Sequence, residues 1–152
     1  MIERERKFIC WYLPKGARLF EKHKQFYLYS SKNLEVRVRI KKVAGSGEIK
    51  SELTLKKSID RERRLEYTLP INRYISKLLV VFTRNKVIKN RYIYKENNIK
   101  WEIDCFIFPT GLPIICEYEN SDTYIKELPE FINYEVTGME RYKSRGINKY
   151  NL

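Results

Sequence analysis

The first residues of the chain carry ionisable side chains at every second position. Glu3, Glu5 and Lys7 alternate with Arg4 and Arg6. On a β-strand, positions two apart share one face, so two carboxylates and an ammonium group would point the same way. This arrangement is costly unless a cation and an anion lie between the side chains. The spacing therefore indicates a site where a cation and an anionic ligand meet.

The same alternation recurs in four further strand-like runs. The paired charges are Arg37 with Arg39, Lys89 with Arg91, Glu102 with Asp104, and Glu117 with Glu119. Because one residue separates the members of each pair, their side chains would share one face of a strand. Five such runs predict a sheet with one charged face that carries charges of both signs.

Two architectures can carry such a face. A β-sandwich would leave the charges in bulk water, whereas a closed barrel would gather them around one ligand and turn its apolar residues outward. Solvated faces normally mix small polar residues with scattered charges, but here like charges are paired. The sequence therefore predicts an α+β, mainly β fold, namely a closed eight-stranded antiparallel β-barrel with a few flanking helices.

Short strands and a few helices must position these charges. Period-two patterns predict strands near residues 2–10, 25–31, 34–42, 48–57, 62–69, 87–95, 99–107 and 113–119. Apolar spacing predicts two helices, 71–83 and 121–131, which are expected to pack on the outer surface of the barrel. A short third helix is expected at 140–144. No repeat or linker interrupts the chain, so we expect a single domain, 1–152.

The charge and the composition limit the possible partners. Lys and Arg exceed Asp and Glu by 12 among 152 residues, so an anionic partner is expected: nucleic acid, an anionic membrane or a polyphosphate. No apolar run approaches the length of a transmembrane helix and no signal peptide is evident, so we expect no membrane partner. The three cysteines, Cys10, Cys105 and Cys116, lack metal-ligand spacing and predict a reduced, cytoplasmic chain. His23, among charged neighbours, is expected to be solvated.

Nine motifs, in order, resemble one known family. Glu3-x-Glu5-x-Lys7 is similar to the ExExK signature of the CYTH domain, whose members are the triphosphate tunnel metalloenzymes. The further matches are Tyr27-Leu28, Val36-Arg37-Val38-Arg39, Leu53-Thr54-Leu55-Lys56, Arg64-Leu65-Glu66-Tyr67, Lys89-Asn90-Arg91-Tyr92, Trp101 to Phe106, Cys116-Glu117-Tyr118-Glu119, and the closing motif Glu135 to Tyr142. The resemblance covers almost the whole chain and implies an antiparallel tunnel that binds a triphosphate with divalent metal.

The resemblance also implies roles for individual residues. The side chains expected to bind phosphate are Lys7, Arg37, Arg39, Lys56, Arg91 and Lys143. The carboxylates expected to hold Mg²⁺ or Mn²⁺ are Glu3, Glu5 and Glu119 at a first site, and Glu66, Asp104 and Glu117 at a second site or its water shell. Lys89 and Tyr27 match a lysine–tyrosine pair that assists water activation in some relatives. The residue types suit these roles, because guanidinium groups bind phosphate bidentately and hard cations prefer carboxylate oxygens.

Three functional hypotheses follow. The first is a metal-dependent triphosphatase that acts on inorganic triphosphate or a similarly compact triphosphate. The second, on the same fold, is an adenylyl cyclase or an RNA 5′-triphosphatase, and the net positive charge would suit an RNA 5′ end. The third is a polyphosphate-binding or nucleic-acid-binding module without catalysis, which leaves the six inward carboxylates unexplained. The chain is expected to be a monomer or a homodimer.

Overall fold

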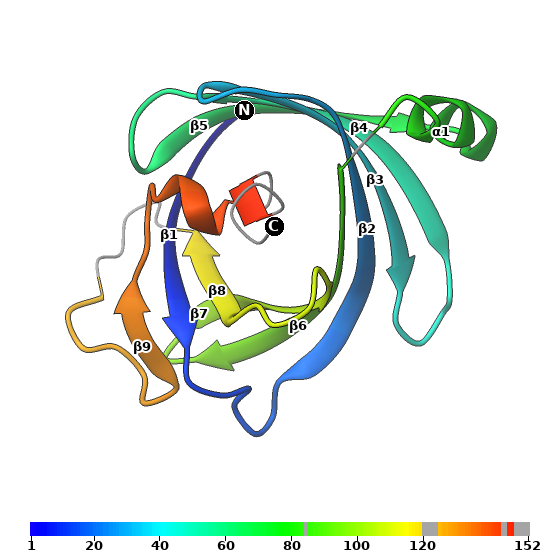
Figure 1. Ribbon diagram of the computed structural model, residues 1–152. Helices are drawn as coiled ribbons and strands as arrows, with labels where there is room; N and C mark the ends of the chain where they lie inside the picture. The colour runs from blue at the N-terminus through cyan, green and yellow to red at the C-terminus, as the bar shows by residue number, and fades with distance from the viewer. Residues whose placement is uncertain (84, 120–124, 144–145, 148–152) are drawn as a thin grey trace.

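The computed structural model of the chain describes residues 1–83, 85–119, 125–143 and 146–147. Within these residues the strands are β1 (Ile2–Cys10), β2 (Arg18–Ser30), β3 (Leu34–Val43), β4 (Ile49–Ser58), β5 (Arg63–Ile71), β6 (Asn85–Glu96), β7 (Ile99–Phe108), β8 (Ile114–Glu119) and β9 (Ile132–Glu135). They pair in the order β5-β4-β3-β2-β6-β7-β8-β1-β9, and β5 also pairs with β1. The second pairing closes eight strands into a barrel, which Figure 1 shows end-on.

The predicted fold class is confirmed. The barrel is antiparallel throughout, and each of the eight predicted strands is present. Two strands differ from the prediction: β2 begins at Arg18 rather than near residue 25, and β9, which has four residues, was not predicted. Residues 1–152 as a single domain stay a prediction.

The pleat of each strand separates ionic from apolar side chains, and β3 illustrates this. Arg37 and Arg39 line the cavity inside the barrel, while the intervening Val38 is fully buried on the outer side. Because neighbouring strands keep this parity in register, Arg37 lies opposite Tyr27 of β2 and Thr54 of β4. The predicted alternation of ionic and apolar residues therefore produces a barrel with an ionic interior and an apolar exterior.

The main hydrophobic core lies outside the barrel, against the outer face of β1, β7 and β8. Its buried members are Phe8, Cys10, Trp101, Ile103, Cys116, Tyr118, Phe131 and Ile132. Trp101 is fully buried, and its ring centroid lies 4.9 Å from that of Tyr118 and 5.7 Å from those of Phe8 and Phe131, in edge-on contacts. The strand β9 and the residues just before it cover this part of the wall.

The prediction of a helix at 121–131 is wrong for the part that the structure describes. Residues 125–131 form bends and a turn, and residues 121–124 lie outside the described residues. Pro129 disfavours helical backbone at the preceding residue. Its carbonyl instead accepts a hydrogen bond from the Ile132 amide at 3.0 Å, which closes a turn. The core is therefore covered by an irregular segment and a short strand.

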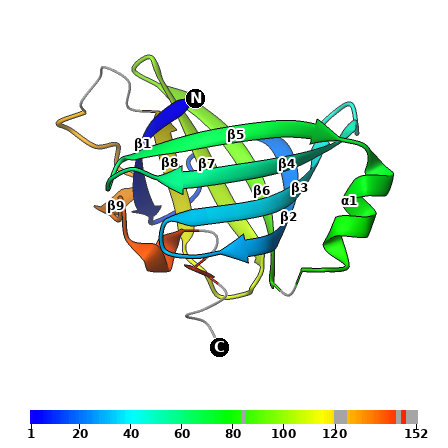
Figure 2. The same ribbon diagram turned by 90° about the horizontal axis from the view of Figure 1, so that it is seen from above.

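The helix α1 (Arg73–Val80) confirms the predicted helix near 71–83, and Asn72 caps it. The side-chain oxygen of Asn72 accepts hydrogen bonds from the amides of Tyr74 and Ile75 at 3.0 and 2.9 Å. Figure 2 shows α1 on the outside of the barrel, where it contacts β4, β3 and β2. It packs with Ser76 buried rather than with its apolar face, which corrects the expectation from the sequence.

Two smaller features complete the fold. A 3₁₀ turn at Glu140–Tyr142 replaces the third predicted helix, and Ser144 lies outside the described residues. The turn belongs to the segment after β9 that passes one mouth of the barrel. Among the helices of the described residues, none is both long and apolar enough to span a lipid bilayer.

Candidate active site

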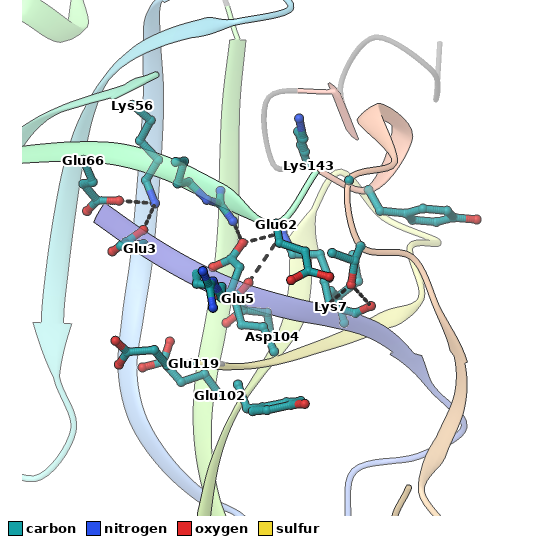
Figure 3. Close-up of a pocket in the computed structure, with 18 of the residues that line it drawn as sticks. Glu3, Glu5, Lys7, Lys56, Glu62, Glu66, Glu102, Asp104, Glu119 and Lys143 are labelled. Carbon is teal, nitrogen blue, oxygen red and sulfur yellow. Dashed lines mark hydrogen bonds and ion pairs between the residues drawn. The ribbon is translucent and has the colours of Figure 1, made fainter. Parts of the chain in front are cut away.

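The barrel encloses a cavity of about 500 Å³ whose wall is mostly charged. The predicted site residues that line it are Glu3, Glu5, Lys7, Arg37, Arg39, Lys56, Glu66, Lys89, Arg91, Asp104, Glu117, Glu119 and Lys143. They come from seven strands and from the segment after β9, and Figure 3 shows many of them pointing toward one another. Among the predicted residues, Tyr27 does not line the cavity.

Lys89 and Arg91 of β6 surround the carboxylate of Asp104 on β7. Arg91 donates two hydrogen bonds of 2.8 Å to the two oxygens of Asp104, and Lys89 also pairs with this carboxylate. Burial alone would raise the pKa of Asp104, but Arg91 and Lys89 hold it well below its usual range. Burial, together with Arg91, lowers the pKa of Lys89 to about 8, against the opposing effect of Asp104. This cluster is ionised and almost closed to water.

The strands β1 and β8 bring two carboxylates of like charge face to face. In their register, Glu5 lies opposite Glu119, and Lys7 lies opposite Glu117. The ammonium group of Lys7 lies 3.5 Å from Glu117 and 3.8 Å from Glu5. Burial raises the pKa of Glu117, but Lys7 and Arg91 lower it to about 2 in total. Directly opposed carboxylates destabilise a sheet unless a cation neutralises them.

A third cluster joins β1, β4 and β5. Lys56 lies opposite Glu66, with which it forms an ion pair, and its ammonium group lies 3.3 Å from Glu3 (Figure 3). Burial raises the pKa of Glu3, although Lys56 opposes the effect. Burial would also raise the pKa of Glu66, but Lys56 lowers it to about 2. One lysine thus serves two carboxylates, and the Glu3 carboxylate is the less firmly ionised of the two.

The guanidinium groups of β3 keep unused hydrogen-bond donors. Arg37 pairs with Glu35 at 3.2 Å and donates to Gln25 at 3.5 Å. Among the described residues, its Nε and Nη2 atoms have no acceptor, nor do the Nε of Arg39 and the Nε2 of Gln25, although all four atoms are buried. Buried donors without acceptors are expensive. Several of them converging on one cavity indicate a site for an anion that supplies the missing acceptors.

Comparisons with known proteins agree with this geometry. No family model matches the sequence. The chain is 28% identical over 128 residues to an inorganic triphosphatase of Acetivibrio thermocellus, which covers 84% of this chain and 80% of the relative. The crystal structure of the inorganic triphosphatase NE1496 is similar over 95% of this chain and 96% of that one, with 28% identity and a TM-score of 0.67.

The chain therefore has the CYTH, or triphosphate tunnel, fold. The resemblance that the nine motifs indicated is confirmed. The PH1819 protein from Pyrococcus horikoshii shares the tunnel fold at 24% identity and a TM-score of 0.56, over 82% of this chain and 79% of that chain. The cavity described above is the interior of this tunnel fold.

The interior of the tunnel corrects the expectation for His23. Its side chain is 1% exposed rather than solvated, and its Nε2 lies 2.7 Å from a carboxylate oxygen of Glu21. Burial, aided by Lys89 and Arg91, lowers the pKa of His23 to about 2, so the imidazole is neutral. The sequence did contain a signal for the burial of His23. On a strand, His23 points to the face opposite Lys22 and Lys24, so exposed lysines place the histidine inside.

Lys89 and Tyr27, predicted to assist water activation, lie at different levels of the β2–β6 register. Lys89 lies opposite His23 in the β2–β6 register, whereas Tyr27 lies opposite Asn85, four residues further along β2. The hydroxyl of Tyr27 donates a hydrogen bond of 3.0 Å to Gln25, and the side chain is buried. Tyr27 therefore contacts Gln25, which also accepts a hydrogen bond from Arg37. A direct role of Tyr27 in catalysis stays a prediction.

Sequence reasoning missed several residues of the tunnel wall. Arg64 pairs with Glu5, and Glu35 pairs with Arg37. Both could have been found by parity, because Arg64 shares a strand face with Glu66 and Glu35 shares one with Arg37. Glu102, which the sequence placed on the charged face with Asp104 but to which no site role was assigned, lines the tunnel and accepts a 2.5 Å hydrogen bond from Arg91. With these residues included, Glu5, Arg37 and Arg91 of the tunnel wall each have an oppositely charged partner.

The tunnel carboxylates are the donor type that a divalent metal prefers, but their side chains are not clustered as metal ligands in this structure. In residues 1–83, 85–119, 125–143 and 146–147, no three carboxylate, imidazole or thiol groups converge closely enough to hold an ion. Their donors are nonetheless hard oxygens, which Mg²⁺ and Mn²⁺ prefer, and two of these carboxylates, Glu5 and Glu119, lie directly opposite each other. In the structure, Glu5 forms ion pairs with Lys7 and Arg64.

Proposed function

We propose that the chain is a divalent-metal-dependent triphosphatase that hydrolyses the terminal phosphoanhydride bond of inorganic triphosphate or of a similarly compact triphosphate. The observation that carries the proposal is that unused arginine donors and opposed carboxylates line the same cavity. An anion alone would satisfy the arginines and repel the carboxylates. A metal-bound polyphosphate satisfies both. The names of the relatives, inorganic triphosphatases at 28% identity, support the same activity.

The cationic side chains of the tunnel would bind and orient the substrate. Arg37 and Arg39 present buried donors from β3, and Lys56 lies on the adjacent strand β4. Lys7, Arg91 and Lys143 line the same cavity and complete the set. Because a triphosphate carries several negative charges on closely spaced oxygens, fixed cations along a channel can hold it in one register. Burial strengthens these contacts and excludes most of the competing water.

The carboxylates would hold the metal and the water around it. We assign Glu3, Glu5 and Glu119 to a first divalent cation, and Asp104, Glu66 and Glu117 to a second cation or to its water shell. When bound, Mg²⁺ or Mn²⁺ supplies neutralisation of phosphate charge and Lewis acidity. Lys89, with its pKa near 8, keeps its proton at neutral pH and can donate a hydrogen bond to a phosphate oxygen. The reaction needs a fixed substrate more than it needs covalent chemistry from the protein.

Phosphate release from a panel of substrates tests this proposal. The purified chain is assayed with inorganic triphosphate, ATP, triphosphorylated RNA and diphosphate, each with Mg²⁺, with Mn²⁺ and with a chelator. Rapid release from inorganic triphosphate that the chelator abolishes is the expected result. Preference for triphosphorylated RNA would move the activity to RNA 5′ ends, and cyclic AMP from ATP would make the chain a cyclase. Salt-sensitive, metal-independent binding without turnover would reduce it to a binding module.

A further inference from the structure

The apolar stripe of α1 faces solvent rather than the barrel. Tyr74, Leu78 and Phe82 are 74, 63 and 71% exposed, and Ile75 and Val81 are exposed beside them. At 100° per residue these five positions fall on one side of the helix. The turn extends to Phe82, whose backbone N–H donates a 3.1 Å hydrogen bond to the Leu79 carbonyl. Five large apolar side chains on one small element form an exposed patch of a kind that marks a docking surface.

The opposite side of α1 explains why this orientation is stable. Ser76 is buried, Leu79 and Val80 are half-buried, and α1 contacts β4, β3 and β2. The hydroxyl of Ser76 donates to the Arg73 carbonyl at 2.9 Å, which satisfies it where it faces the wall. Rotation of the helix to bury the stripe would instead expose Ser76, Leu79 and Val80. The outward stripe is therefore a built feature of the fold.

The charges around the stripe select the kind of partner. Arg73 and Lys77 lie along one flank of α1, and the helix contains no acidic residue. In an antiparallel pair of two such helices the same flank would face itself, so the four cations would repel. The whole chain adds a net charge of +12. A second copy is thus disfavoured, and a partner with negative charge beside an apolar layer is favoured.

We propose that α1 lies in the interface of an anionic membrane, with its stripe at the acyl boundary and with Arg73 and Lys77 among the headgroup phosphates. A lipid surface offers both required chemistries in one plane, and amphipathic helices with basic flanks and Tyr, Leu or Phe on the apolar face bind there. Figures 1 and 2 show α1 projecting from the side of the barrel. The helix would lie on the membrane without crossing it. This reverses the expectation from the sequence of no membrane partner and is independent of the catalytic proposal.

Sedimentation with lipid vesicles tests the proposal. The full chain is mixed with phosphatidylcholine vesicles that contain phosphatidylserine and with vesicles of phosphatidylcholine alone. We expect binding to the first and little to the second. The double substitution Leu78→Gln with Phe82→Gln should weaken binding at least about tenfold, because two apolar groups leave the acyl boundary. Both side chains are exposed, so the circular dichroism melting curve should not change.

Matched variants decide whether α1 carries the binding. Trp11→Gln removes an aromatic side chain of similar exposure, 67%, from the β1–β2 loop, and it should bind as the native chain does. Arg73→Gln with Lys77→Gln should weaken binding, while Lys95→Gln, on the exposed end of β6, should have a much smaller effect. Equal binding of the stripe variant and the native chain, equal loss with Trp11→Gln, or no binding to either vesicle would overturn the proposal. So would concentration-dependent dimers that the stripe variant abolishes.

Discussion

The two sides of the barrel wall carry similar alternating sequences but are built differently. The packed wall, which consists of β7, β8 and β1, has its outer face buried beneath β9 and Phe131. The open wall, which consists of β3, β4 and β5, has α1 as its cover, and Tyr67 and Leu69 of β5 remain 57 and 62% exposed. Alternation thus determines which way a side chain points, while other segments determine whether its outer neighbours are covered.

The inner faces of the two walls also differ. The packed wall carries most of the carboxylates, including Glu5, Asp104 and Glu119, whereas the open wall carries Arg37 and Arg39 with unused donors. Metal ligands must be held within narrow geometric limits, but phosphate can be bound by several cations of adjustable position. Most of the proposed metal ligands thus lie on the more firmly packed strands, and the buried arginine donors lie on the open wall. The predictions below test this contrast.

The largest effect is expected from the core of the packed wall. Trp101→Ala should lower the free energy of unfolding by about 3–5 kcal/mol, because it leaves a cavity among three aromatic rings. Leu69→Ala on the open wall should change it by less than about 0.5 kcal/mol, because its side chain is largely exposed. Denaturant unfolding measures both. Similar losses from the two variants would remove the contrast between the walls.

The next effect concerns the substrate side of the tunnel. Arg37→Gln should lower kcat/KM for inorganic triphosphate by about 100-fold, because the neutral amide cannot replace a buried bidentate donor. Arg18→Gln removes an exposed guanidinium at the start of β2 and serves as the matched control, with unchanged kinetics expected. Steady-state phosphate release measures both variants. If Arg37→Gln and Arg18→Gln behave alike, phosphate is not bound along the inner face of the open wall.

A pH dependence should arise from His23, at the interior position opposite Lys89. Its pKa is about 2 in the folded chain and about 6.5 when unfolded, so the unfolded state binds more protons between these values. Stability from the neutral imidazole is therefore complete above pH 6.5 and is lost as pH falls. Between pH 7 and pH 5 the free energy of unfolding of the native chain should fall by roughly 2 kcal/mol more than that of the His23→Gln variant. Urea unfolding at both pH values measures this, and parallel losses would show that His23 is not buried.

The smallest effect is expected where β9 is attached to the packed wall. Arg6 donates two hydrogen bonds of 3.0 Å to the carboxylate of Glu135 and, through a third, contacts the Tyr118 hydroxyl. Glu135→Gln should lower stability by about 1 kcal/mol, because it removes the charge from a partly exposed bidentate pair. Thermal unfolding measures the loss. A loss as large as that of Trp101→Ala would mean that this ion pair, rather than aromatic packing, holds the cover in place.

Much of the tunnel was predictable because its signal is local. The two-residue period around Arg37 and Arg39 determines strand type, face and burial together. The same parity places Glu5 and Lys7 inside; the predicted barrel is confirmed, and most of the predicted site residues line its cavity. Of the predicted site residues, Tyr27 alone is not among the described residues that line the cavity, although it lies opposite Arg37 in the β2–β3 register.

The remaining features depend on contacts between distant segments. The sequence of α1 reports that Leu78 and Phe82 share a face, but not what that face meets. The distance between Lys89 and Tyr27 depends on the β2–β6 register, which the strand patterns do not determine. His23 was predicted to be solvated because its sequence neighbours are charged. Its position in the strand nevertheless points its side chain to the inner face. β9 is too short to give a periodic signal.

A crystal soaked with inorganic triphosphate and Mn²⁺ tests the central claim most directly. Anomalous scattering locates the manganese, and difference density locates the phosphates. We predict manganese beside Glu3, Glu5 and Glu119 and a phosphate chain along Arg37 and Arg39, with Lys7 displaced from Glu5. Manganese and triphosphate bound on the outer surface, with the interior ion pairs unchanged, would contradict the account.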